Sequence, residues 1–287
     1  METNQMKFYP QDADNISKTI LVGMPAAGKS TMTRYLAEGI AKDTGIKLRE
    51  VSTDKRIKEL AKDKGNAFVV DFLNKRNIPA EDQKLLIHAS DFIEKYSEPM
   101  FRDFESAVII DMLNKGDFNH NIVDLGGKAI LHPETSKAFK EKGYNCIFLD
   151  TNKDVLTAHV IRDYERWKDG AEITRSNINK PIDRAVKAEA GKSILAYARH
   201  YYVAPDPYQA DSSYKQHPDY VQNLKTARDK MAHHMVSTLL EQREKGYKTS
   251  STASVKVSGD LEKDAAQIMK IVRANNKILT KSNSNGR

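Results

Sequence analysis

Apolar residues along the chain fall into short runs, separated by longer stretches in which they recur every three or four positions. Short apolar runs bounded by turns are typical of buried strands, and the longer spacing is typical of amphipathic helices. Five runs have the strand pattern: residues 19–22, 48–51, 121–125, 145–149 and 254–257. Because they alternate with helical stretches, the pattern predicts an α/β fold of three layers, in which helices flank a parallel five-stranded sheet.

The helical stretches indicate how the chain is organised. Helices are predicted at about residues 29–41, 133–142, 153–166, 182–200, 224–239 and 262–275. We expect one domain over residues 18–275, with helical insertions at about 61–98 and 212–253. Residues 1–17 are polar and predict a loose lead-in, and residues 276–287 predict a disordered tail.

Composition narrows the class of protein. The 287 residues are 39% apolar, and no stretch approaches the roughly 18 apolar residues of a membrane span. Residues 1–18 lack the basic start and apolar core of a secretory signal, so we expect a cytoplasmic protein. Cys146 is the only cysteine and lies in an apolar run, which excludes an intramolecular disulfide and predicts a buried thiol.

The net charge of +7 is distributed unevenly. Residues 212–287 carry 14 Lys or Arg and 7 Asp or Glu, whereas the rest of the chain carries 32 of each sign. The excess therefore lies downstream of the motifs that carry chemistry. We interpret it as a solvated basic surface, with an anionic partner such as a membrane surface or nucleic acid as the alternative.

One motif organises the chemistry. Residues 23–31 read Gly-Met-Pro-Ala-Ala-Gly-Lys-Ser-Thr, which fits G-x-x-x-x-G-K-S between the first strand and a helix. Such a loop turns its backbone N–H groups around a phosphate chain, and the helix that follows adds its positive dipole end. The sequence therefore predicts that a nucleotide binds here by its phosphates, together with Mg²⁺.

Roles within this loop follow from side-chain chemistry. Lys29 would reach the terminal phosphates, and the Ser30 hydroxyl would ligate Mg²⁺. The predicted nucleotide-binding residues are Gly23, Ala26, Ala27, Gly28, Lys29, Ser30 and Thr31.

Further candidates follow the ends of other strands. Asp54 comes after the second strand, and Gly126 and Gly127 come after the third. Ligands of open parallel sheets lie at the carboxyl ends of the strands, so we expect these residues to share one site with the phosphate loop. The alternative for Asp54 is a helix cap.

The motifs taken together resemble the shikimate kinase family of phosphate-loop kinases, over about residues 19–275. Arg102, in Phe-Arg-x-x-Glu, is similar to the family's arginine that grips the substrate carboxylate. Asp54 takes the place of the carboxylate that holds the substrate hydroxyls, and Gly126-Gly127 resembles its substrate loop. The polar stretch 170–181 resembles a mobile lid.

The resemblance implies roles for two further residues later in the chain. At three positions this sequence also differs from the pattern of the family. Lys180 stands where the lid has its catalytic Arg, and Arg199 would be the second carboxylate-binding residue. Ser52 replaces an Asp of the Mg²⁺ shell, for which Asp124 would compensate as a metal ligand. Lys128 replaces a third glycine. We also note that Arg175 would serve if Lys180 does not.

These observations lead to the hypothesis of an ATP-dependent kinase whose acceptor is a small hydroxylated acid. Lys29 would stabilise the transferring group, Asp54 would orient the acceptor hydroxyl, and paired Arg side chains would bind its carboxylate. Shikimate is the leading acceptor. The alternatives are a kinase of another sugar acid or polyol, and a nucleotide-binding interaction protein that has lost transfer activity.

Overall fold

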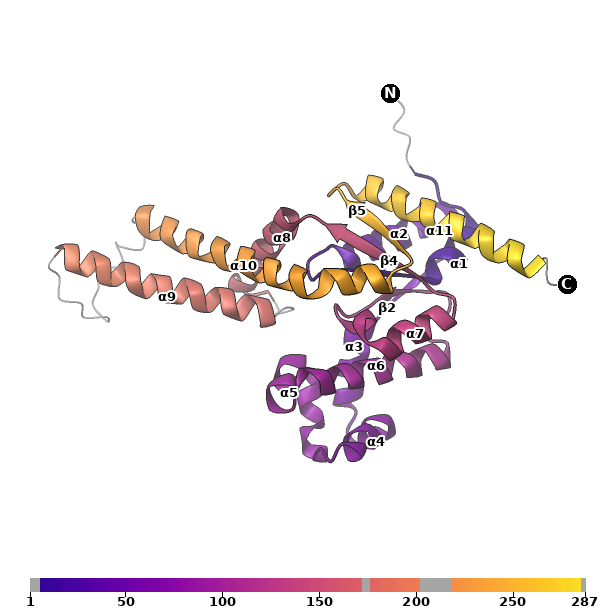
Figure 1. Cartoon of the computed structure of the whole chain (residues 1–287), viewed down its shortest axis with the longest axis horizontal. Coiled ribbons are helices and arrows are strands. Elements are labelled where there is room, and N and C mark those ends of the chain that lie inside the picture. Colours follow the sequence, from indigo (N-terminus) through magenta and orange to yellow (C-terminus); the bar gives the residue numbers. More distant parts are fainter. Residues whose placement is uncertain (1–5, 172–175, 202–217, 285–287) are drawn as a thin grey trace, which may run out of the picture. The chain divides into compact units, whose positions relative to one another are not determined.

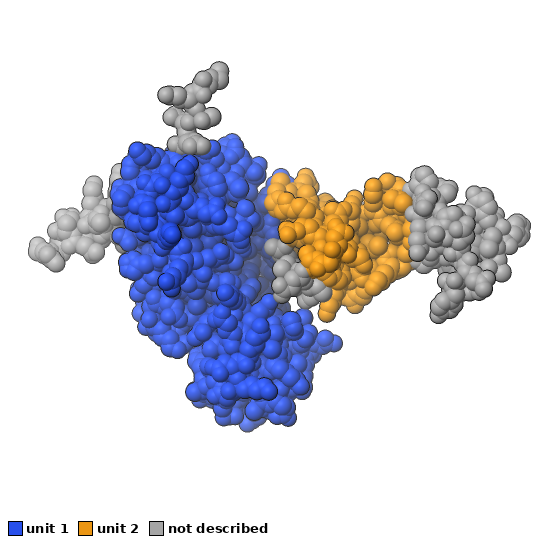
Figure 2. All heavy atoms as spheres, turned by 180° about the vertical axis from the view of Figure 1, so that it is seen from behind, with its two compact units in different colours: residues 1–152, 242–287 blue, residues 153–241 orange. Residues whose placement is uncertain are grey.

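The computed structural model describes residues 6–171, 176–201 and 218–284 (Figure 1). The chain divides into two compact units (Figure 2). Unit 1 comprises Met1–Asn152 and Gln242–Arg287, and unit 2 comprises Lys153–Glu241. The predicted organisation as one domain with two insertions stays a prediction.

Unit 1 is built on a five-stranded sheet in the order β2-β3-β1-β4-β5. Every neighbouring pair of strands is parallel. The strands are β1 (Thr19–Val22), β2 (Arg49–Ser52), β3 (Asn121–Asp124), β4 (Asn145–Thr151) and β5 (Ala253–Val257). The predicted α/β fold with a parallel five-stranded sheet is confirmed, and each strand begins within one residue of its predicted start.

Position in the sheet explains why the strands differ in composition. All four residues of β1 are buried, as are all but one of β4, because these central strands are covered on both faces. The edge strand β2 has no buried residue and carries Arg49 and Glu50. Charged side chains on an edge strand protect it from pairing with another chain.

Helices cover both faces of this sheet. Figure 1 shows α1, α2 and α11 together on one side and α6 with α7 on the other. The helices of unit 1 are α1 (Pro10–Ser17), α2 (Lys29–Thr44), α3 (Thr53–Lys62), α4 (Ala67–Lys75), η1 (Ala80–Ile87), α5 (Ala89–Lys95), α6 (Glu98–Lys115), η2 (Ala129–Leu131), α7 (Pro133–Glu141) and α11 (Leu261–Ser284). Residues 242–250, the last turns of α10, also belong to this unit.

Unit 2 consists of helices: α8 (Lys153–Lys168), α9 (Ser176–Tyr201) and most of α10 (Pro218–Ser250). A polar cluster joins α8 to α9, since the carboxylate of Asp183 accepts hydrogen bonds from Tyr164 and from Lys168 at 3.1 Å. Lys187 also lies 2.8 Å from Asp183. None of the helices among the described residues is long and apolar enough to cross a membrane.

Helices extend further toward both ends of the described part of the chain than the sequence predicted. Residues 1–17 were expected to be a loose lead-in, but Pro10–Ser17 forms α1, in which Ile16 is buried. Asp12 of this helix accepts hydrogen bonds from Arg273 of α11 at 2.9 and 2.6 Å, which ties the two ends together. Helix α11 continues to Ser284, past the predicted end at residue 275.

Two helices extend beyond their predicted bounds. Helix α9 begins at Ser176, before its predicted start at residue 182, and contains Pro181, whereas the role of the stretch 170–181 as a lid stays a prediction. Residues 172–175, including Arg175, lie outside the described part of the chain. Helix α10 likewise continues to Ser250, past its predicted end at residue 239.

Candidate functional site

The phosphate loop adopts an unusual backbone between β1 and α2. Gly28 has a φ of 83° and Ala26 a φ of 66°, so both lie in the left-handed region. This region suits glycine but is uncommon for alanine, and such conformations gather at functional sites. Gly23 has a φ of 155°, and a Cβ there would lie 3.1 Å from the carbonyl oxygen of Leu149 on β4.

Lys29 is held within this loop. Its ammonium donates hydrogen bonds to the carbonyl oxygens of Gly23 at 3.1 Å and Met24 at 3.0 Å. Lys29 is also the first residue of α2, so its charge lies at the positive end of that helix. Both features concentrate positive charge where a phosphate chain would lie.

The two predicted metal ligands are in direct contact. The hydroxyl of Ser30 donates a hydrogen bond of 2.8 Å to Oδ2 of Asp124, at the end of the neighbouring strand β3. A hydroxyl and a carboxylate are hard oxygen ligands of the kind that Mg²⁺ takes together with water and substrate phosphates. Ser30 and Asp124 therefore fit the magnesium ion that the sequence predicts. Thr31 is exposed in the first turn of α2.

Asp54 and Gly126 meet at the carboxyl end of the sheet, next to the phosphate loop. The N–H of Gly126 donates a hydrogen bond of 3.0 Å to the hydroxyl of Thr53. A Cβ at residue 126 would lie 2.8 Å from Oδ1 of Asp54 and 2.5 Å from Oε1 of Glu105, so a larger residue there would have to displace one of these carboxylates. Ser52, and not Asp54, accepts the capping hydrogen bond of α3, from the N–H of Lys55.

The electrostatics of Asp54 suit a group that handles a proton. Its side chain is open to solvent, yet protein atoms crowd round the carboxyl and desolvate it. This desolvation raises the pKa of Asp54, and the negative charge of Asp124 raises it further. Arg102 and Lys29 oppose the shift, which indicates that both cations lie near the carboxylate.

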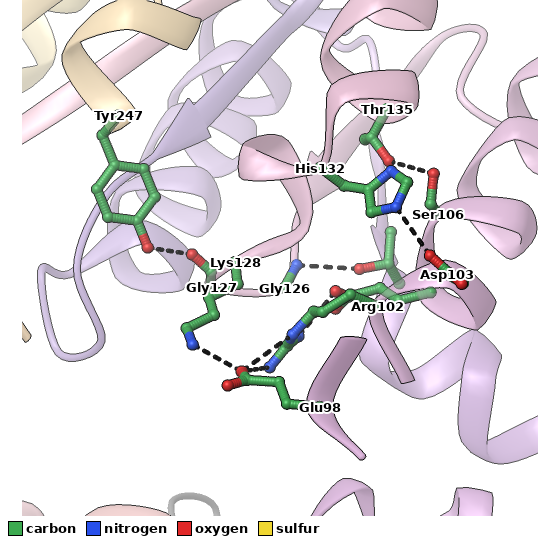
Figure 3. A network of polar contacts seen from close by, with 12 residues as sticks. Glu98, Arg102, Asp103, Ser106, Gly126, Gly127, Lys128, His132, Thr135 and Tyr247 are labelled. Carbon is green, nitrogen blue, oxygen red and sulfur yellow. Dashed lines mark hydrogen bonds and ion pairs between the residues drawn. The ribbon is translucent and has the colours of Figure 1, made fainter. Parts of the chain in front are cut away.

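Arg102 lies in α6 with its guanidinium between two carboxylates (Figure 3). Nη1 donates to Oε2 of Glu105 at 2.8 Å, and the Glu105 side chain is only 2% exposed. Nε and Nη2 donate at 3.4 and 3.2 Å to one oxygen of Glu98, to which the ammonium of Lys128 donates at 2.6 Å. Arg102 is 23% exposed, so the site remains open to solvent beside it.

The glycine loop that carries Lys128 is fixed from two directions. The carbonyl oxygen of Gly127 accepts a hydrogen bond from the hydroxyl of Tyr247 (Figure 3). The Tyr247 ring stacks on Phe148 of β4, with ring centroids 5.6 Å apart. On the other side, Nε2 of His132 lies 3.2 Å from a carboxylate oxygen of Asp103. The loop is therefore positioned by α10 and by α6.

Arg243 is a site residue that sequence reasoning missed. It lies one turn before Tyr247 on α10, is 7% exposed, and has a buried Nε with no hydrogen-bond partner among the described residues. Burial lowers its pKa, an effect that Tyr247 and Glu98 oppose and Arg102 reinforces, so these groups lie close together. A sequence signal existed, because Met235, Leu239, Arg243 and Tyr247 follow one another at intervals of four.

The remaining predicted residues belong to unit 2. Lys180 lies in α9 of unit 2, where its side chain is exposed. Arg199 also falls in α9, but its side chain lies outside the described part of the structure. Their roles in a lid and in carboxylate binding stay predictions.

We compared the sequence with protein families and with curated proteins. Residues 81–193 match the family model of shikimate kinase, a stretch that includes Arg102, Gly126 and Gly127. A shikimate kinase of Rhodococcus erythropolis is 32% identical over 133 residues, which cover 46% of this chain and 58% of the relative. One of Nitrobacter winogradskyi is 32% identical over 146 residues, covering 51% of this chain and 52% of the relative. Over these stretches the chain is similar to shikimate kinases.

Two solved structures of shikimate kinases were also found. One, from Acinetobacter baumannii in complex with shikimate, is 15% identical with a TM-score of 0.47, covering 93% of this chain and 98% of that one. The other, from Bacteroides thetaiotaomicron, is 12% identical with a TM-score of 0.46, covering 89% and 97%. The chain aligns with a little more than half the length of the two curated shikimate kinases named above.

Proposed function

We propose that the protein transfers the terminal phosphoryl group of ATP to a hydroxyl of a small carboxylated polyol, with shikimate as the leading acceptor. The observation that carries the proposal is the position of Arg102 near Asp54, together with the buried guanidinium of Arg243 near Arg102 and Glu98. Two guanidinium groups suit a planar carboxylate, and a buried arginine with an unpartnered Nε is stabilised when an anion binds it.

The proposed reaction assigns a task to each group. Asp54 accepts a hydrogen bond from the acceptor hydroxyl and takes its proton as the new O–P bond forms and the bond to the leaving ADP oxygen breaks. Lys29 and the N–H groups of the loop stabilise charge on the transferring phosphoryl group. A magnesium ion held by Ser30 and Asp124 would neutralise charge on the phosphates. We propose that the reaction takes place in the cytoplasm, where ATP is available.

The test is an ADP-release screen of the purified protein over hydroxylated acids, with shikimate included, and over the same compounds reduced from carboxylate to alcohol. We expect ADP release with one or more acids and much less with the matching alcohols. Equal rates with acids and alcohols would contradict a carboxylate site and would favour a neutral polyol as acceptor.

A nucleotide-binding protein without transfer activity is the second candidate. The Glu98–Lys128 pair favours it, because this pair occupies space beside Arg102 where an acceptor would bind. Under that alternative, ATP with Mg²⁺ would raise the melting temperature, yet no compound in the screen would release ADP.

A further inference from the structure

Glu98 occupies the side of Arg102 that is best suited to an acceptor carboxylate. The Nε and Nη2 atoms of an arginine form a fork that can bind both oxygens of one carboxylate. In this protein both atoms donate to the single oxygen Oε1 of Glu98, at 3.4 and 3.2 Å. Bonds between a guanidinium and a carboxylate are usually about 2.7–2.9 Å long, so this contact is loose.

The same oxygen has a much closer partner. Nζ of Lys128 donates to Oε1 of Glu98 at 2.6 Å, and the Glu98 side chain is 40% exposed. Ser97 caps the N-terminus of α6 by accepting from the N–H of Met100, which fixes the backbone next to Glu98. The backbone is therefore fixed, whereas the carboxylate is exposed enough to change partners.

Glu105 contrasts with Glu98 on the opposite side of the same guanidinium. Its side chain is 2% exposed, and it accepts from Nη1 of Arg102 at a normal distance of 2.8 Å. It also lies close to Gly126, where an added Cβ would be 2.5 Å from its Oε1, so its burial makes it harder to displace than Glu98. Of the two carboxylates on Arg102, Glu98 is thus the one that a ligand can displace.

We infer that Glu98 is an internal competitor for the acceptor carboxylate and that Lys128 receives it when the acceptor binds. In the empty site Glu98 shares its oxygen between Arg102 and Lys128. In the occupied site the acceptor carboxylate takes the Nε and Nη2 edge of Arg102, and Glu98 stays with Lys128 alone. A neutral acceptor cannot compete for the guanidinium, so the pair sets how strongly the site responds to a carboxylate.

This inference rests on the proposed function and assigns Glu98 and Lys128 as specificity-determining residues at that site. It explains the lysine at the third position of the glycine loop, where added bulk and charge would otherwise only obstruct the acceptor. The two side chains come from α6 and from the loop after β3, thirty residues apart in the sequence.

The test is a double-mutant cycle with Glu98→Gln and Lys128→Met, read by calorimetric titration with shikimate and by KM and kcat. Glu98→Gln removes the competitor, so shikimate should bind about two- to fivefold more tightly, the range of an exposed ion pair. Lys128→Met leaves Glu98 with Arg102 alone, so shikimate should bind more weakly by a similar factor. In both variants KM should change while kcat changes little.

The double variant distinguishes the inference from a simple charge effect. If Lys128 acts through Glu98, the loss caused by Lys128→Met should disappear in the Glu98→Gln background. If the loss persists unchanged, Lys128 contacts the acceptor directly and the inference is wrong. Glu94→Gln and Lys140→Ala make the same changes in net charge at exposed positions on α5 and α7, and neither should alter binding.

Two failures can be told apart in this experiment. If neither shikimate nor any other acid of the screen binds the parent protein, the proposed function is wrong and the inference falls with it. If an acid binds and is phosphorylated but Glu98→Gln leaves its affinity unchanged or weakens it, only the inference is overturned.

Discussion

The phosphate-loop end of the site consists of the nine consecutive residues 23–31. The acceptor end, where the acceptor would bind, is assembled from four separate segments: α3, α6, the glycine loop after β3, and α10. At the first end, Ala26 and Gly28 shape the backbone and Lys29 is bound to carbonyl oxygens of its own loop. At the second end, Arg102 and Arg243 belong to helices that are far apart in the sequence. One end is therefore local in sequence, and the other depends on tertiary packing.

The two ends also differ in how their charges are balanced. The loop concentrates positive charge at the position where a phosphate chain would bind. The acceptor end brings together the cations Arg102, Lys128 and Arg243 with the carboxylates Asp54, Glu98 and Glu105. Because ion pairs join Arg102 to Glu98 and Glu105, and Glu98 to Lys128, substitutions at the acceptor end should be coupled, while those in the loop should act singly.

The largest effect is expected at the loop, from Lys29→Ala. This change removes the cation that stabilises the transferring group, so turnover should fall by about 10²- to 10³-fold, as when one stabilising donor is lost. Stabilisation of the fold by ATP with Mg²⁺ should also diminish, which thermal denaturation measures. Lys47→Ala, at an exposed position after α2, is the matched control and should behave like the parent. Equal thermal shifts in Lys29→Ala and the parent would count against a working loop.

Asp54→Asn tests the point where the two ends meet. The amide keeps the shape of the side chain but cannot accept the hydroxyl proton, so turnover should fall by on the order of 10². ATP binding should be nearly unchanged, since the nucleotide is held by the loop. Steady-state kinetics together with ATP titration measure both quantities. Normal turnover in Asp54→Asn with a true acceptor would exclude Asp54 as the group that takes the proton.

Arg243→Ala tests whether the two ends of the site act separately, because it should weaken acceptor binding and leave ATP binding unchanged. Loss of a charge-assisted contact costs roughly 1.5–3 kcal/mol, or about ten- to a hundred-and-fifty-fold in acceptor affinity. ATP affinity should hardly change. Lys245→Ala removes an exposed cation of the same helix and serves as the control. Should Arg199→Ala weaken acceptor binding while Arg243→Ala does not, the sequence-based assignment would be right and the structural one wrong.

The sequence predicted those parts of the molecule that are determined locally. The five strands and the phosphate loop follow from runs of neighbouring residues, and Asp54 and Gly126 follow from the rule that parallel strands place their carboxyl ends together. Arg243 was missed because which face of a 33-residue helix enters the site depends on packing. Helix α1 was missed because its Asp12 is bound by Arg273, 261 residues away.

The smallest effect is expected from a substitution away from the site, in the helices η1 and α5. These helices support α3, which carries Asp54 at the acceptor end. Side-chain Nε2 of Gln83 in η1 donates to the carbonyl oxygens of Leu60, Ala61 and Asp63, at the end of α3 opposite Asp54. The neighbouring Asp82 accepts hydrogen bonds from Lys95 at 2.6 Å and from Tyr96. Asp82 thereby joins α5 to the element that holds α3.

Asp82→Asn should lower the melting temperature by a few degrees at pH 7, with little effect on ATP binding. Hydrogen bonds from Lys95 and Tyr96 lower the pKa of Asp82 in the folded protein. Its stabilising contribution is therefore complete above the unfolded-state pKa of about 3.9 and is lost as the pH falls through the lower folded-state value. Urea denaturation measures the free energy of unfolding. The difference between Asp82→Asn and the parent should be the same at pH 7 and pH 5 and smaller at pH 3.5.

Asp71→Asn is the control. It breaks an exposed pair with Lys75 and should change stability little at any pH. A difference that grew on acidification would mean that Asp82 stabilises the fold in its protonated form, and the acceptor end would then not depend on this ion pair.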